Sequence, residues 1–293
     1  MSQLQAQERW TVGKLIQWTS DFLKRKGAES PRLDSEVLLA HVLAWPRVQL
    51  YTRFEDEIDD SARSRFRELV KQRAEGKPVA YLVGRKEFYS IDLRVDPNVL
   101  IPRPETEFLV LEFLTAFKNV EAPFAVDIGT GSGCVALACL HQHKTARFLA
   151  TDISPRAVDT ALENARRVGV EGRFEARVGS LYEAIRGSAP FDAILSNPPY
   201  LRTDEIAALA PDVRDFEPHL ALDGGTSGLD AIRPLIAEAA DLLRPGGRLL
   251  IEFGFDQADS IRELVALDPR LELVGVIQDG ARHPRVLHAR RTQ

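Results

Sequence analysis

The feature that most constrains the fold is an apolar segment that runs directly into a glycine-rich turn. Phe124–Ile128 has the composition of a strand buried on both faces, and Gly129-Thr-Gly-Ser-Gly133 follows it at once. Further short apolar runs alternate with helical stretches, which implies a mostly parallel sheet with right-handed crossovers and an α/β fold. The predicted strands are 124–128, 147–151, 174–178, 191–196 and 247–253, with 271–278 and 286–290 as an antiparallel pair at the sheet's end, and the predicted helices are 133–142, 155–168, 228–243 and 257–267.

The N-terminal part of the chain has a different texture. Apolar residues at helical spacing, a stop at Gly27 and a new start at Ser30-Pro31 predict a small helical domain over residues 1–80. This segment carries no catalytic constellation, so two interpretations stay open: a bundle that only packs, and a docking domain for a macromolecular substrate. Its expected anchors are Trp10, Trp18 and Trp45, one of which could instead reach a partner.

The segment 81–104 changes from helical to alternating periodicity. Apolar and polar residues alternate over 89–95, and Asp96-Pro97-Asn98 has the composition of a turn before Val99-Leu100-Ile101. We therefore predict a short β-hairpin with its turn at Asp96–Asn98. It would link the helical domain to an α/β domain over 105–293.

The composition argues against several classes of protein. The chain has 293 residues, with 38 Lys+Arg, 43 Asp+Glu and a net charge of −5, which does not suit a basic nucleic-acid coat. No apolar run approaches the roughly 18 to 20 residues that span a bilayer. Two cysteines cannot form a disulfide framework, and no Cys/His cluster has metal-site spacing. We expect a soluble, cytoplasmic chain with no metal.

The glycine turn and two acids predict a nucleoside cofactor. Glycine permits positive φ and lets a ligand approach the backbone, but a tight βα turn alone would also use it. The dinucleotide fingerprint would place Gly or Ala where Cys134 stands. Asp127 precedes the turn, and Asp152 ends the next strand, where a carboxylate can accept both hydroxyls of a ribose. Acids on both sides suit a cofactor with hydroxyls and positive charge, of which S-adenosylmethionine is the best fit.

Asn197-Pro-Pro-Tyr200 follows the predicted strand 191–196 and suggests the chemistry. Asn-Pro-Pro also makes a good turn, which is the simpler interpretation. An amide nitrogen is a poor nucleophile because its lone pair is delocalised. The Asn197 side-chain oxygen and the Pro198 carbonyl can accept hydrogen bonds from one NH2 group and aim its lone pair at a methyl group. Tyr200 can cover the planar amide, so we predict Asn197, Pro198 and Tyr200 as catalytic residues.

These motifs together resemble the PrmC/HemK family, the glutamine-N5 methyltransferases of class 1 peptide chain release factors. The resemblance covers nearly the whole chain and implies a seven-stranded class I (Rossmann-like) methyltransferase domain with a helical docking domain joined by a β-hairpin. It also implies methyl transfer from S-adenosylmethionine to the glutamine of a Gly-Gly-Gln motif. The segments on which the resemblance rests are Leu100–Glu107, Asp127–Gly133, Asn197–Tyr200, Glu217-Pro218 with Gly224-Gly225, and Arg244–Gly247.

The resemblance assigns roles to individual residues. The cofactor residues would be Asp127, Ile128, Gly129, Thr130, Gly131, Asp152, Leu181 and Asn197, and the substrate residues Asn197, Pro198, Pro199 and Tyr200. Arg103 and Glu105 either line the pocket as substrate residues or pair with each other. The chain departs from the family at Ser180, where many relatives carry an acid near the adenine, and at Phe253, where a smaller aliphatic is common. We expect class 1 release factors as partners, a monomer, and no direct binding to nucleic acid or membrane.

Three alternatives use the same motifs. Adenine-N6 DNA methyltransferases carry Asn-Pro-Pro-Tyr-like sequences, but they need a route to a flipped base and a basic DNA face. A sister family methylates a glutamine of a ribosomal protein, and its segment before the core differs from Pro102–Glu107. A scaffold that binds the cofactor without turnover is the non-catalytic alternative, and a methyl-transfer assay on the purified protein separates it from the others.

Overall fold

The computed structural model describes residues 9–188 and 190–293, which form two compact units. Unit 1 comprises the residues up to Gly84 together with Pro211–Phe216. Unit 2 comprises Arg85–Ala210 and Glu217–Gln293. The β-hairpin, expected as a linker, belongs to unit 2. No helix among the described residues is both long enough and apolar enough to cross a membrane.

Unit 1 is helical, as the periodicity predicts. Thr11 caps the first helix and Asp59 caps the fourth, where its side chain accepts a hydrogen bond from the Ala62 backbone N–H at 2.8 Å. Arg73 joins two parts of the unit, because its guanidinium pairs with Asp34 at 2.7 Å and lies 3.8 Å from Asp212 of the inserted segment. The helices are α1 (Val12–Arg25), α2 (Pro31–Leu43), α3 (Gln49–Thr52), α4 (Asp60–Ala74), α5 (Val79–Val83) and, in the inserted segment, α9 (Pro211–Arg214).

Trp18 is not the buried anchor of the helical bundle that the sequence suggests. Its side chain is 50% exposed and stacks on Phe22 at a centroid distance of 5.4 Å. The Trp10 ring lies perpendicular to the Trp18 ring at a centroid distance of 6.5 Å, so the three aromatic rings form one cluster beside α1. Half of Trp18 is therefore available to a partner.

The hairpin is present, but its turn is not at Asp96–Asn98, so that prediction is wrong. β1 (Arg85–Phe88) pairs with β2 (Ile91–Arg94) across Tyr89-Ser90, whose φ values of 46° and 64° match a two-residue turn that fits strand twist. The Asp96 side chain instead caps a local turn by accepting the Asn98 N–H at 2.9 Å. No strand follows at residues 99–101.

A seven-stranded sheet forms the centre of unit 2 and confirms the α/β expectation. Its strand order is β5-β4-β3-β6-β7-β9-β8. Neighbouring strands from β5 to β7 are parallel, whereas β9 is antiparallel to both β7 and β8, as the sequence predicts for the chain's end. The strands are β3 (Phe124–Ile128), β4 (Arg147–Asp152), β5 (Phe174–Val178), β6 (Phe191–Ser196), β7 (Leu243–Glu252), β8 (Leu271–Gln278) and β9 (Pro284–Arg291).

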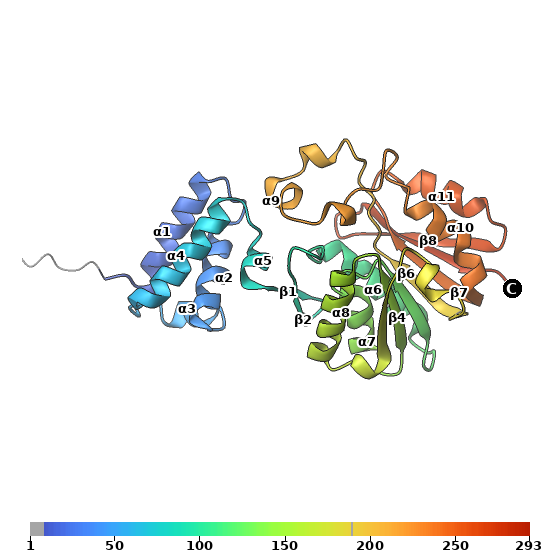
Figure 1. The fold of residues 1–293 in the computed structure, drawn as a ribbon, viewed down its shortest axis with the longest axis horizontal. Coiled ribbons are helices and arrows are strands. Elements are labelled where there is room, and N and C mark those ends of the chain that lie inside the picture. The colour runs from blue at the N-terminus through green and yellow to red at the C-terminus, as the bar shows by residue number, and fades with distance from the viewer. Residues whose placement is uncertain (1–8, 189) are drawn as a thin grey trace, which may run out of the picture. The chain divides into compact units, whose positions relative to one another are not determined.

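Helices cover both faces of this sheet (Figure 1). One apolar core joins the sheet to α6 (Glu107–Phe117), α7 (Cys134–Gln142) and α8 (Pro155–Val168), and the β-hairpin contributes to it. A second core joins the opposite face to α10 (Ile232–Leu242) and α11 (Ala258–Ala266). Apolar burial on both faces explains why the central strands lack polar alternation.

Asn164 of α8 fastens the hairpin to the glycine turn. It is fully buried, and its side chain exchanges hydrogen bonds of 2.8 and 3.0 Å with the Arg94 backbone and donates to the Ser132 carbonyl at 2.9 Å. These three contacts hold two otherwise separate segments beside the carboxyl end of the sheet.

We predict that Asn164→Ala lowers the free energy of unfolding of unit 2 by about 2–4 kcal/mol, because it leaves buried backbone groups of Arg94 and Ser132 without partners. Native-state hydrogen exchange of the β3 and β4 amides measures the change. Asp159→Ala, on the exposed face of the same helix, is the control. Equal effects of the two substitutions would contradict the assigned role of Asn164.

Candidate functional site

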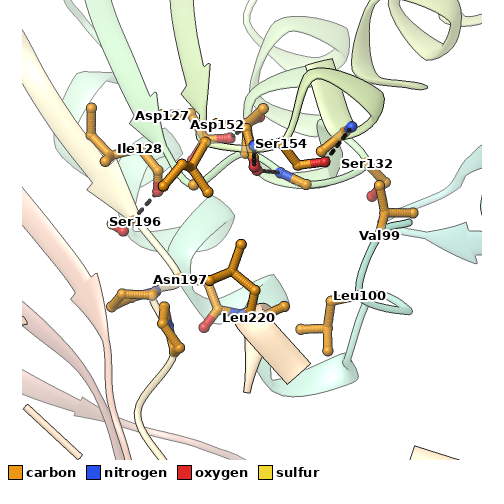
Figure 2. A pocket seen from close by; sticks show the side chains of 18 of the residues that line it. Val99, Leu100, Asp127, Ile128, Ser132, Asp152, Ser154, Ser196, Asn197 and Leu220 are labelled. Atoms are coloured by element: carbon orange, nitrogen blue, oxygen red, sulfur yellow. Dashed lines mark hydrogen bonds between the residues drawn. The ribbon is translucent and has the colours of Figure 1, made fainter. Parts of the chain in front are cut away.

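The pairing of β3 with β6 brings the two main motifs to one edge of the sheet. Ile128, the last residue of β3, is in register with Ser196, the last residue of β6. The Ser196 hydroxyl donates to the Ile128 carbonyl at 2.8 Å. The segments that follow β3 and β6 therefore both leave the sheet at its carboxyl edge. The glycine turn and Asn197 line a common pocket there (Figure 2).

This pocket has a volume of about 380 Å³ and lies within unit 2. All eight predicted cofactor residues line it, and so do Ser180, Arg103, Pro198 and Pro199. Tyr200 and Glu105, which the sequence also suggests for the site, do not line it. The pocket is further lined by Val99 and Leu100 of the segment that follows the hairpin and by Pro218 and Leu220 of a later loop, none of which has a predicted role.

The conformation of the glycine turn lets a ligand approach its backbone closely. Gly129 and Gly131 have φ values of 72° and 55°, which residues with a Cβ rarely adopt. The N–H groups of Gly129 and Thr130 donate to the Thr151 carbonyl at 2.8 and 2.9 Å, which fastens the turn to β4. A Cβ at Gly129 or Gly131 would meet no atom within 4 Å. The open space beside this backbone is therefore room for a ligand.

Asp152 at the end of β4 accepts backbone hydrogen bonds with both of its oxygens, one from the glycine turn and one from the residue that precedes α8. Oδ2 accepts the Gly131 N–H and Oδ1 accepts the Ser154 N–H, each at 2.9 Å. Burial raises the pKa of Asp152, and the two hydrogen bonds partly oppose that effect. Each carboxylate oxygen has further lone pairs, so Asp152 can hold the turn and still accept two hydroxyl groups from a ligand.

Asp127 is a second, more deeply buried acid of the site. Only 1% of it is exposed, and its Oδ2 accepts the Thr130 hydroxyl at 2.7 Å. Burial raises the pKa of Asp127 to about 6, although hydrogen bonds from Thr130 and from the Ala136 backbone act in the opposite direction. A positively charged ligand group would stabilise its ionised form.

Leu181 lines the pocket in a strained conformation. Its φ of 46° is in the left-handed region, which is costly for a leucine. The Thr151 hydroxyl donates to its carbonyl at 3.3 Å. β4 therefore supports both the glycine turn and Leu181.

Asn197 is oriented by a hydrogen bond to Thr106. Its amide Nδ2 donates to the Thr106 hydroxyl oxygen at 3.1 Å. The amide oxygen is therefore the atom that remains to accept a hydrogen bond from a ligand in the pocket. Tyr200 points elsewhere, because its hydroxyl lies 3.5 Å from Oε1 of the buried Glu252.

Arg103 does not pair with Glu105, so that interpretation is wrong. Its guanidinium donates to Glu217 Oε1 at 2.5 Å, while Oε2 of the same buried carboxylate accepts the Ile101 N–H at 3.1 Å. Glu217 thus fixes the segment that carries Arg103 along the pocket wall. Sequence reasoning missed the roles of Glu217 and Thr106, although both lie inside motifs that carry the family resemblance.

The described residues contain no group of His, Cys, Asp and Glu side chains that could hold a metal ion. Cys134 and Cys139 lie on α7, and burial raises the pKa of both thiols. They are protonated packing residues at neutral pH.

Comparisons with known proteins identify both parts of the chain. Residues 14–84 match the family described as PrmC N-terminal domain, and residues 105–212 match the family described as methyltransferase small domain. The release factor glutamine methyltransferase of Rhodopirellula baltica is 42% identical over 282 residues, which cover 95% of each chain. The protein of that name from Moorella thermoacetica is 45% identical over 238 residues, covering 81% of this chain and 83% of its own.

Solved structures agree on the fold. A methyltransferase from Pyrococcus furiosus aligns with a TM-score of 0.51 at 19% identity, covering 70% of this chain and 91% of its own. The catalytic domain of hMettl16, solved in complex with hairpin 6 of the MAT2A 3′UTR, aligns with a TM-score of 0.54 at 15% identity, covering 77% and 82%. At such low identities these structures establish the class I methyltransferase fold alone.

We predict that Asp127 makes unit 2 less stable as the pH rises. Its pKa is about 6 in the folded chain against an ordinary value of 3.8. Between these values the folded state binds more protons than the unfolded state, so the free energy of unfolding falls with rising pH and levels off above about 6. Relative to Asp127→Asn, the wild type should lose about 2.5 kcal/mol between pH 4 and 7.

Urea unfolding followed by circular dichroism measures this difference. Tryptophan fluorescence reports unit 1 separately, because all three tryptophans lie there. Parallel pH profiles for the wild type and Asp127→Asn would contradict the assignment of the elevated pKa to Asp127.

Proposed function

The chain belongs to the release factor glutamine methyltransferase family, and from this premise we propose that it methylates the side-chain amide nitrogen of a release factor glutamine. The single observation that carries the proposal is the geometry of Asn197. Its amide oxygen is left to accept a hydrogen bond in the same pocket as the glycine turn and Asp152. The finer assignment is to N5 of the glutamine in the Gly-Gly-Gln motif of class 1 release factors.

The residues of the pocket fit S-adenosylmethionine. The open backbone at Gly129 and Gly131 accommodates a ligand in contact with the turn, and Asp152 has acceptor capacity for two ribose hydroxyls. Asp127 and Asp152 supply negative charge for an ammonium and a sulfonium group. Leu181 and Ile128 supply apolar walls for a base. When bound, this cofactor supplies an electrophilic methyl group.

Asn197 and Pro198 would orient the nucleophile. The Asn197 oxygen and the Pro198 carbonyl accept hydrogen bonds from the glutamine NH2 group and hold its nitrogen with the lone pair toward the methyl group. Pro198 and Pro199 stiffen the backbone, so these acceptors are in place before the substrate arrives. Tyr200 supports the Asn-Pro-Pro turn through its contact with Glu252. Arg103 lines the same pocket and would contact the substrate backbone.

Unit 1 offers a surface for the release factor. A groove of about 500 Å³ has an apolar floor that includes the half-exposed Trp18. Lys26, Arg63, Arg67 and Lys71 line it, against the single acid Glu75. This combination suits an acidic protein surface with apolar side chains. Docking would therefore use unit 1, whereas the chemistry uses the pocket of unit 2.

We further propose that the chain acts as a monomer in the cytoplasm, where translation factors are found. Its net charge of −5 supports a protein partner rather than direct binding to nucleic acid or membrane.

Replacing Asp152 tests the cofactor assignment. Asp152→Ala should weaken S-adenosylmethionine binding by about 2–4 kcal/mol, because two hydrogen bonds to a charged acceptor are lost and the Gly131 N–H loses its partner. Isothermal titration calorimetry measures the affinity. An unchanged affinity would remove Asp152 from the cofactor site.

A matched pair on α4 tests docking. Arg67→Glu, in the groove, should raise the KM for the intact release factor about 10-fold, because it reverses charge complementarity. Arg65→Glu makes the same charge change on the same helix but outside the groove, and it should have little effect. Steady-state kinetics with the intact factor and with a Gly-Gly-Gln peptide separate docking from chemistry. Equal KM values for the two variants would exclude the groove as the docking surface.

Asn197→Ala tests the proposed function itself. The substitution removes the acceptor that aims the glutamine nitrogen, so the single-turnover rate on a release factor should fall at least 100-fold while cofactor affinity stays within about threefold. Transfer of labelled methyl groups measures the rate, with a Gln→Glu release factor as the substrate control. A near-normal rate for Asn197→Ala would contradict the orienting role.

A further inference from the structure

The loop 217–224 lines the pocket but has no part in the reaction described above. Its contribution to the lining comes from Pro218, Leu220 and Ala221. Leu220 lines the pocket although 62% of it is exposed. A single exposed leucine is ordinary on a protein surface. The meaning of this one therefore depends on how the loop holds it at the pocket.

The first end of the loop is anchored to the segment 101–103. Glu217 is 4% exposed, and its Oε2 accepts the Ile101 N–H at 3.1 Å. Its Oε1 accepts a hydrogen bond from the Arg103 guanidinium at 2.5 Å. Both oxygens of a buried carboxylate are thus satisfied by one segment, and breaking these bonds would leave the charge buried without a partner.

The other end of the loop is anchored to the Asn-Pro-Pro-Tyr turn. The N–H of Leu201, the residue after Tyr200, donates to the Leu222 carbonyl at 3.1 Å, and the Gly224 N–H donates to the Leu201 carbonyl at 2.8 Å. A Cβ at Gly224 would lie 2.8 Å from the Pro199 carbonyl oxygen and 2.9 Å from the Tyr200 Cα. Only glycine lets the loop pack so closely on this turn.

Between these anchors the loop has a defined conformation. Pro218 has a φ of −65°, and His219–Ala221 form one turn of 3-10 helix. The Ala221 N–H donates to the Pro218 carbonyl at 2.9 Å. Leu220 is the central residue of this turn, so its side chain is held in place at the pocket rather than carried by a free loop.

The position of Leu220 is on the substrate side of the pocket. Figure 2 shows Asn197, Leu220 and Leu100 along one side, and Asp127 and Asp152 along the other. The two acids are the groups that suit a cationic cofactor, and Asn197 is the group that suits the substrate amide. The backbone next to the substrate glutamine would therefore pass Leu220.

We propose that Leu220 is a specificity-determining residue, which admits the glutamine when the residue before it is glycine and excludes larger residues at that position. This inference rests on the proposed function and deepens it. A glycine can lay its backbone against the leucine side chain, whereas a substrate Cβ would meet that side chain. The pocket leaves little room to avoid the contact, because its 380 Å³ would hold both the cofactor and the glutamine side chain.

Two forms of a class 1 release factor test the proposal, one with Gly-Gly-Gln and one with Gly-Ala-Gln. The wild type should prefer the first by about 10- to 200-fold in kcat/KM, the usual effect of one added methyl group in a tight site. Leu220→Ala should narrow this ratio at least about fivefold, mainly by a gain on the alanine form. Comparing ratios cancels any effect of the alanine on the release factor itself.

A matched leucine supplies the control. Leu267 is 78% exposed, follows α11 and does not line the pocket, so Leu267→Ala should keep the wild-type ratio. Both substitutions are at exposed positions and should leave the fold intact. Calorimetry should show that Leu220→Ala binds S-adenosylmethionine as the wild type does.

Four results would overturn the proposal. They are equal rates of the wild type on the two factors, an unchanged ratio in Leu220→Ala, the same change in Leu267→Ala, and a loss of cofactor affinity in Leu220→Ala. The last result would place Leu220 against the cofactor instead of the substrate. A wild type that binds the cofactor but methylates neither factor would contradict the proposed function, and this inference with it.

Discussion

The register between β3 and β6 is the interaction on which the site depends. Ile128 and Ser196 end their strands side by side, and the Ser196 hydroxyl closes the pair with a hydrogen bond to the Ile128 carbonyl. A shift of one residue would turn the side chains of either strand to the opposite face. The glycine turn and Asn197 would then no longer open on one pocket. Apolar burial on both faces of the sheet keeps this register fixed.

Two acids line the pocket where a cationic cofactor would bind. They are Asp127 and Asp152, and burial raises the pKa of both, that of Asp127 to about 6. Burial makes both carboxylates unfavourable in the empty protein, and a bound cation relieves part of that cost. Burying these carboxylates at the site before the cofactor binds therefore lowers the stability of the fold. The guanidinium that lines the same pocket is paired within the chain, because Arg103 bonds to Glu217.

Much of the fold was predictable because local patterns and packing agree. The bounds of β5, β6, β8 and α8 match the predicted ranges, and Ser154-Pro155 marks the start of α8. The hairpin turn was missed because Tyr89-Ser90 lacks the glycine or asparagine typical of such turns. The link from Thr106 to Asn197 joins residues 91 positions apart, and the link from Arg103 to Glu217 joins residues 114 positions apart, so spacing could not predict them. The exposure of Trp18 was also not predictable, because helical periodicity does not say which aromatic rings stay exposed.

The most direct test of the account is to locate the methyl group by tandem mass spectrometry. A class 1 release factor is incubated with S-adenosylmethionine and the purified protein, and then digested and fragmented. We predict one added methyl group on the side-chain nitrogen of the glutamine in the Gly-Gly-Gln motif. A methyl group on any other residue, or a factor that stays unmodified while the protein binds the cofactor, would contradict the account.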